Sequence, residues 1–258
     1  MSIIGRIVGT LIGAAFGPLG LIAGFVFGNL FDKAISGESG QTIYTPFGRK
    51  ADSLDQRQSM SFVAIFSLLG KVAAADGSIS QASRRSLDRL IDHTLQLDSV
   101  SASYARRLFE QAGASSATAE AIARQYYQTF QDDYSLLETT MNMIMSVAMS
   151  DGNLSSREEQ VIASIARVFG FSQQDLDRLK ARYGINTSSI SKAYATLGLS
   201  ESASDEDVKK AYRKLSLEYH PDAVASKGLS AEFAKFATEK FKDIQEAYDS
   251  IKKQRGIR

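Results

Sequence analysis

The feature that most constrains the fold is an uncharged, largely apolar run over residues 7–31. At about 1.5 Å per residue, a helix of this length spans the roughly 30 Å hydrocarbon core of a bilayer. A cleaved signal peptide is the alternative, but its apolar region covers only about 7–15 residues. The sequence therefore predicts a membrane anchor over residues 1–35, built around one transmembrane helix.

Glycines recur along this run mostly in steps of four residues, which keeps them near one face of a helix. Because small residues let a second helix approach closely, we expect the anchor to pair into a homodimer. The alternative is an anchor whose glycines make no specific contact. Pro18 either kinks the helix or turns it into a re-entrant hairpin, and both remain open. The predicted packing residues are Gly9, Gly13, Gly17, Gly24 and Gly28.

Basic residues on the two sides of the run predict its orientation, because cytoplasmic flanks carry the excess of Lys and Arg. The N-terminal flank offers only Arg6, whereas Lys33, Arg49, Lys50 and Arg57 follow the run. We therefore expect the body of the protein in the cytoplasm. Residues 36–53 mix Gly, Ser, Thr and Pro without periodicity and are interpreted as a linker.

Composition favours an all-α body and excludes several functions. Prolines occur only at positions 18, 46 and 221, and an interior proline costs a helix about 3 kcal/mol. The absence of cysteine excludes disulfides, zinc–thiolate clusters and thiol catalysis. The 30 basic and 29 acidic residues nearly cancel, which gives nucleic-acid binding no bulk electrostatic support. With two histidines and no phosphate-binding glycine loop, we expect no enzyme and no cofactor.

Apolar residues recur at helical spacing through the middle of the chain, as at Phe62, Ile65, Phe66 and Leu69. The pattern predicts helices over residues 54–75, 80–97, 99–112, 115–131, 134–149, 155–169 and 172–183.

Two segments of this body have similar sequences, VAAADGSIS at 72–80 and VAMSDGNLS at 147–155. Each Asp-Gly pair ends an apolar helix shortly before the next helix begins. The duplicated pattern resembles the TerB-like helical domain of tellurite-resistance proteins, which predicts such a domain over residues 54–185. The resemblance also implies acidic loops proposed to bind a divalent metal. The candidates here are Asp76, Asp151, Glu158 and Glu159.

A hard cation needs several converging oxygen ligands, and the first repeat lacks them. Ser83 and Arg84 stand where the second repeat has its two glutamates. We therefore expect both Asp-Gly segments to serve as turns and helix caps, with Ser155 and Glu158 forming a capping box.

Residues 190–258 carry the most specific motif. A helix that begins after Ser204 has an apolar face that includes Val208 and Leu215, and it leads directly into His220-Pro221-Asp222. After an intervening loop, a second long helix with an apolar stripe should pack antiparallel against the first. The opposite, basic face of the first helix carries Lys209, Lys210, Arg213 and Lys214.

The string KKAYRKLSLEYHPD closely resembles the J-domain of the DnaJ family. The resemblance implies a DnaK-type chaperone as partner, bound by the His-Pro-Asp residues and by the four basic residues. Pro221 should hold His220 and Asp222 in a rigid, exposed turn, with Asp222 meeting an arginine of the partner. Taken alone, the basic face would be an ordinary solvated helix surface. Ala223 and Glu218 stand where many J-domains carry basic residues.

The order of anchor, TerB-like body and J-domain resembles the DjlA family of membrane-anchored, DnaJ-like co-chaperones of bacteria. This implies the inner membrane, a single-pass topology and activation of a chaperone ATPase. The alternative function is a TerB-like module that senses metal or envelope stress, with a secondary role for the J-domain.

Overall fold

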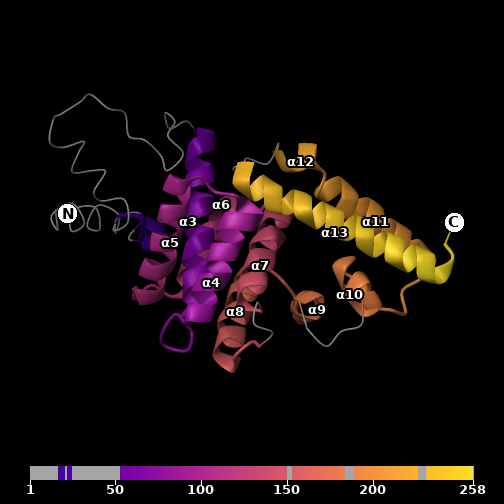
Figure 1. Cartoon of the computed structure of the whole chain (residues 1–258), viewed down its shortest axis with the longest axis horizontal. Helices are drawn as coiled ribbons and strands as arrows, with labels where there is room; N and C mark the ends of the chain where they lie inside the picture. Colours follow the sequence, from indigo (N-terminus) through magenta and orange to yellow (C-terminus); the bar gives the residue numbers. More distant parts are fainter. Residues whose placement is uncertain are drawn as a thin grey trace.

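The computed structural model describes residues 17–20, 22–24, 53–149, 153–183, 189–225 and 231–257. In this part of the chain all regular secondary structure is helical (Figure 1), which confirms the predicted all-α class. The anchor predicted over 1–35 and the linker predicted over 36–53 lie mostly outside the described residues. Among the residues that are described, no helix combines the length and the apolar character needed to cross a bilayer.

The body is a bundle of helices arranged around one buried helix, α3. Every side chain from Ser61 to Gly70 in α3 is buried, so this helix is covered on all sides. It contacts α5, α6, α7 and α8, which enclose it (Figure 1). The body helices are α3 (Ser53–Ala73), α4 (Gln81–Arg89), α5 (Ser99–Ala114), α6 (Ala119–Phe130), α7 (Tyr134–Ala148), α8 (Ser156–Val168) and α9 (Gln173–Tyr183).

The single helix predicted over 80–97 is instead two elements, α4 and a π-helix, η1 (Leu90–Leu95). Residues five apart share a face in a π turn, and Leu90 and Leu95 both lie in the core. Gln96 then takes a left-handed conformation with φ of 50°, and its N–H donates to the Ile91 carbonyl. Helical structure is thus continuous over Gln81–Leu95, close to the predicted bounds, but its last part is a π-helix that the sequence does not signal.

A short apolar piece of the N-terminal segment also packs on the body. Leu19 and Ile22 are buried, and the Leu19 N–H donates to Gln125 Oε1 of α6 at 3.0 Å. Gly17 has φ of 78°, so the backbone changes direction just before Pro18. Gly17 lies against Gln125, and its predicted pairing with a second copy stays a prediction. Gly9, Gly13 and Gly28 lie outside the described residues.

The C-terminal domain contains the predicted antiparallel hairpin, in which α11 and α13 lie side by side (Figure 1). Tyr212 and Tyr248 stack across it with ring centroids 4.1 Å apart. Arg255 closes its far end by donating to the Glu201 and Ala203 carbonyls, both at 2.7 Å. The helices of this domain are α10 (Ser189–Thr196), α11 (Asp205–Glu218), α12 (Pro221–Ala225) and α13 (Ala231–Arg255).

The close approach of α3 to α5 makes Gly70 a test of the body's packing. A Cβ built on Gly70 would lie 2.1 Å from the backbone oxygen of Phe109, which cannot move aside like a side chain. We predict that Gly70→Ala destabilises the body by about 1–3 kcal/mol or more, through overpacking. Thermal unfolding of the solubilised chain, followed by circular dichroism, measures this. Ser103→Ala on the exposed side of α5 is the control, and equal midpoints for the two variants would contradict the packing described.

Candidate functional site

The His-Pro-Asp turn lies at the junction between α11 and α12. The Tyr219 N–H donates to the Leu215 carbonyl at 2.9 Å, which closes the last turn of α11. Pro221 biases His220 away from helical conformation and itself opens α12. At a first helical position the missing N–H of proline costs nothing. The residues just after Asp222, expected to be a loop, therefore begin with a short helix.

The turn is exposed, as the sequence predicts. His220, Pro221 and Asp222 are all exposed, and the Asp222 side chain retains 94% of its accessible surface. Within the turn, the Asp222 N–H donates to His220 Nδ1 at 3.3 Å, which orients the imidazole. The imidazole also meets the Phe241 ring of α13 edge-on, with centroids 5.9 Å apart. The turn thus presents a carboxylate to solvent from a backbone held by both helices of the hairpin.

The basic face predicted on α11 is open to solvent. Lys210, Arg213 and Lys214 are exposed and Lys209 is half-buried. Within the described part of the chain, none of the four makes a salt bridge, so their charges are available to a partner.

Leu217 is a residue of this face that the sequence reasoning missed. It is 75% exposed, the highest value among the large apolar side chains that are exposed in the described residues. At about 100° per residue, Leu217 projects from the middle of the basic face, near Arg213 and Lys214. A helical wheel of α11 would have found it. An apolar side chain surrounded by cations and close to an exposed turn is a feature of binding surfaces.

Two of the four candidate metal ligands have other roles in the structure. Glu158 accepts the Ser155 N–H at 2.9 Å, completing the predicted capping box at the start of α8. Glu159 forms an ion pair with Lys180 of α9. Asp76 is exposed in the turn after α3, and Asp151 lies outside the described residues. Across the ranges that the structure describes, no three acidic or His residues come together as a metal site would require.

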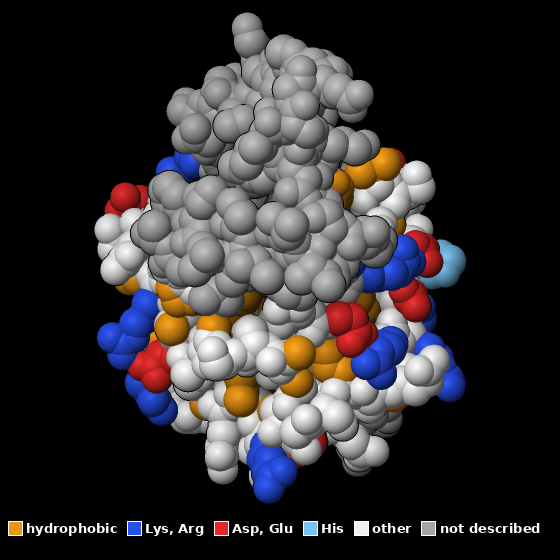
Figure 2. Space-filling model, turned by 90° about the vertical axis from the view of Figure 1, so that its left-hand side faces the viewer, with side chains coloured by type: hydrophobic (Ala, Val, Ile, Leu, Met, Phe, Trp, Pro, Cys, Tyr) orange, Lys and Arg blue, Asp and Glu red, His pale blue; other side chains and the backbone are white. Residues whose placement is uncertain are grey.

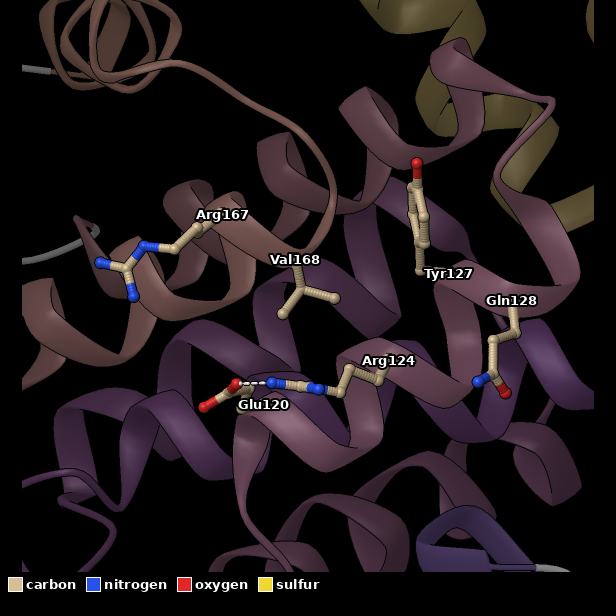
Figure 3. Close-up of a pocket in the computed structure, with 6 residues that line it drawn as sticks. All are labelled: Glu120, Arg124, Tyr127, Gln128, Arg167 and Val168. Carbon is tan, nitrogen blue, oxygen red and sulfur yellow. Dashed lines mark hydrogen bonds and ion pairs between the residues drawn. The ribbon is translucent and has the colours of Figure 1, made fainter.

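The body also has a surface hollow of about 380 Å³ between α6 and α8, lined by Tyr127, Gln128 and Val168 besides three charged residues. Figure 3 shows that Arg124 is turned toward Glu120 of the same helix, and the two form an ion pair. This pairing lowers the pKa of the Glu120 carboxyl, mainly through the hydrogen bond from Arg124. Arg167 lies farther along the rim (Figure 3), and the hollow gathers no convergent set of polar groups.

Charge on the outer face of the body is mixed. In the view of Figure 2, Lys and Arg side chains are interspersed with Asp and Glu, and neither sign gathers into one patch. The described side chains visible in this view form no basic patch of the kind that binds nucleic acid.

Three family models match the chain. The tellurite resistance protein TerB model matches residues 62–181, and the DnaJ domain model matches residues 192–256. The model of the co-chaperone DjlA transmembrane domain matches residues 1–52.

Curated relatives match over nearly the full length. The chain is 30% identical over 241 residues to the co-chaperone protein DjlA of Shewanella oneidensis, covering 90% of the chain and 89% of the relative. It is 30% identical to that of Photobacterium profundum, covering 100% and 99%. It is 32% identical to that of Vibrio cholerae, covering 100% of both. No solved structure matches.

The capping role of the second Asp-Gly segment can be tested directly. We predict that Ser155→Ala lowers the free energy of unfolding by about 1 kcal/mol, because α8 loses an N-cap hydrogen bond. Unfolding should be insensitive to millimolar Mg²⁺ or Ca²⁺, as followed by circular dichroism. A stabilisation by either cation that Glu158→Gln abolishes would contradict the capping role and support a metal site.

Proposed function

The chain belongs to the DjlA family of co-chaperones, and from this premise we propose that it stimulates ATP hydrolysis by a DnaK-type chaperone through His220, Pro221 and Asp222. The family resemblance predicted from the sequence is confirmed by the matches to the full chain. The observation that carries the proposal is the exposed, proline-defined turn at the end of α11.

Asp222 supplies the central contact in this proposal. Its carboxylate is almost fully exposed, and the His220 imidazole lies beside it, with Nδ1 3.7 Å from Oδ2. A carboxylate held in this way can accept paired hydrogen bonds from an arginine of the chaperone. Because Pro221 fixes the backbone before it, little conformational freedom is lost when the contact forms.

The face of α11 supports the proposal with two further contributions. Lys210, Arg213 and Lys214 are free to attract an acidic surface, which speeds encounter and sets orientation. Leu217 adds an apolar contact, and full burial of a leucine contributes about 1.5–3 kcal/mol. Charge thus guides the approach, while Leu217 and the turn hold the complex.

In this mechanism the co-chaperone makes and breaks no bond. ATP is hydrolysed in the active site of the chaperone. The J-domain accelerates hydrolysis only if it binds the hydrolysis-competent conformation more tightly than the others, since a ligand shifts an equilibrium by its difference in affinity. The described residues supply a binding surface for that purpose.

The protein is membrane-anchored, as the match of its first 52 residues to the DjlA transmembrane domain indicates. We further propose that the anchor crosses the bacterial inner membrane once, with the body and J-domain in the cytoplasm. The basic residues Lys33, Arg49 and Lys50, which follow the apolar run, support this orientation. Homodimerisation through the anchor glycines remains a separate proposal.

Sensing of metal or envelope stress by the body is the alternative function. Among the described residues, Glu158 caps α8 and Glu159 pairs with Lys180, so neither is available as a metal ligand.

The Asp222 contact makes a direct prediction. The chain reconstituted in lipid should stimulate the ATPase of a DnaK-type chaperone, and Asp222→Asn should return the rate to its basal value. The variant should keep the wild-type circular dichroism spectrum, because the side chain is exposed. Equal stimulation by the wild type and a well-folded Asp222→Asn variant would refute the proposed function.

A second prediction concerns Leu217, and it has a matched control on the body. Leu217→Ser should raise the concentration needed for half-maximal stimulation by roughly tenfold, the loss expected when a largely buried leucine contact is removed. Val100→Ser changes another exposed apolar residue, which lies on α5 and is 56% exposed, and should leave that concentration unchanged. Similar effects of the two substitutions would show that Leu217 does not contact the chaperone.

A further inference from the structure

A buried polar contact joins the TerB-like body to the J-domain. Arg182, near the end of α9, is only 11% exposed and faces Glu138 of α7, which is 13% exposed, with Nη1 and Oε1 3.7 Å apart. The same nitrogen donates to Asn142 Oδ1 at 2.8 Å. The guanidinium is therefore held on the body by two side chains of one helix.

The other end of the same guanidinium reaches the J-domain. Arg182 Nη2 donates to the backbone oxygens of Ala195 at 3.3 Å and Thr196 at 3.1 Å. These carbonyls lie at the C-terminal end of α10, where a positive charge is favoured by the helix dipole. One side chain thus ties body helix α7 to the first helix of the J-domain.

Tyr219 connects this interdomain contact to the His-Pro-Asp turn. This residue directly precedes His220, and its ring is buried against the body. Its hydroxyl lies beside the Glu138 carboxylate of α7. Burial raises the pKa of the Tyr219 hydroxyl, and the negative charge of Glu138 raises it further, so the group stays protonated.

Little space remains around these groups. A gap of only about 10 Å³ remains between the body residues Glu138 and Arg182 and the J-domain residues Tyr219 and Lys240. Lys240 of α13 also places its ammonium over the ring of Tyr183 at 5.0 Å, a second contact between the two domains. Because this end of the interface is tightly packed, a change at Glu138 or Arg182 disturbs contacts on both domains.

We propose that Glu138 and Arg182 are positioning residues that clamp the J-domain, and with it the His-Pro-Asp turn, in one orientation on the TerB-like body. They touch neither the exposed turn nor the basic face and act through Tyr219 and the end of α10. Removing either charge leaves the other buried without its counter-ion, which destabilises the contact. The chaperone is then presented at a fixed place relative to the body; this functional consequence rests on the proposed function above.

The contact that Glu138 and Arg182 make with the J-domain, here called the clamp, can be tested without any chaperone. The chain has no cysteine, so Ser103→Cys on α5 and Asp249→Cys on α13 give one spin label on each domain at exposed positions. Electron–electron double resonance on the full chain in lipid should give one narrow distance distribution. Glu138→Gln and Arg182→Ala should each broaden it while helix content is retained.

Arg178→Ala is the matched control, because Arg178 lies one turn earlier on α9 and pairs with Asp175 at the surface. It should leave the distribution narrow. A distribution that stays narrow in Glu138→Gln, with its nearly isosteric side chain, would overturn the clamp even if Arg182→Ala unfolds. The same variants should raise the half-maximal concentration for ATPase stimulation and leave the maximum rate in place. Broadening in a chain that does not stimulate at all would support the clamp and reject the proposed function.

Discussion

The backbone of Pro221 is the constraint on which the functional surface depends. Without an amide hydrogen and with φ fixed, Pro221 cannot continue α11, so the helix ends at Glu218 and His220 lies outside it. The same residue is suited to start α12, and the chain turns between the two helices at His220. An exposed imidazole and carboxylate follow from that turn. The stacking of Tyr212 on Tyr248 then fixes the hairpin that carries them.

The J-domain packs against the body and is not joined to it by the chain alone. The end of α11 that presents the turn is also the end that packs against α7 and α9, through Tyr219, Glu138 and Arg182. The body therefore contacts the J-domain at Tyr219, the residue that directly precedes His220. This arrangement leaves the basic face and Leu217 open while the opposite side of α11 is covered.

Local features were predictable from the sequence, and contacts between distant segments were not. The helical spacing of apolar residues, the serine caps and the proline after His220 determine local geometry, so the hairpin and the turn followed from them. Gln96 adopts a left-handed conformation that glycine would have signalled, and the π-helix was missed. The pairing of Glu138 with Arg182 depends on how α7 and α9 pack, which no local pattern encodes. Leu217 was readable from a helical wheel and was overlooked because the basic residues around it dominate the pattern.

In the proposed complex, the face of α11 next to the His-Pro-Asp turn docks on the chaperone. Photo-cross-linking from a benzoylphenylalanine at position 217 tests this contact most directly. We expect a cross-link to a DnaK-type chaperone in the presence of ATP, lost with Asp222→Asn, and none from position 100 on α5. A cross-link of equal yield from both positions, or one that survives Asp222→Asn unchanged, would contradict it.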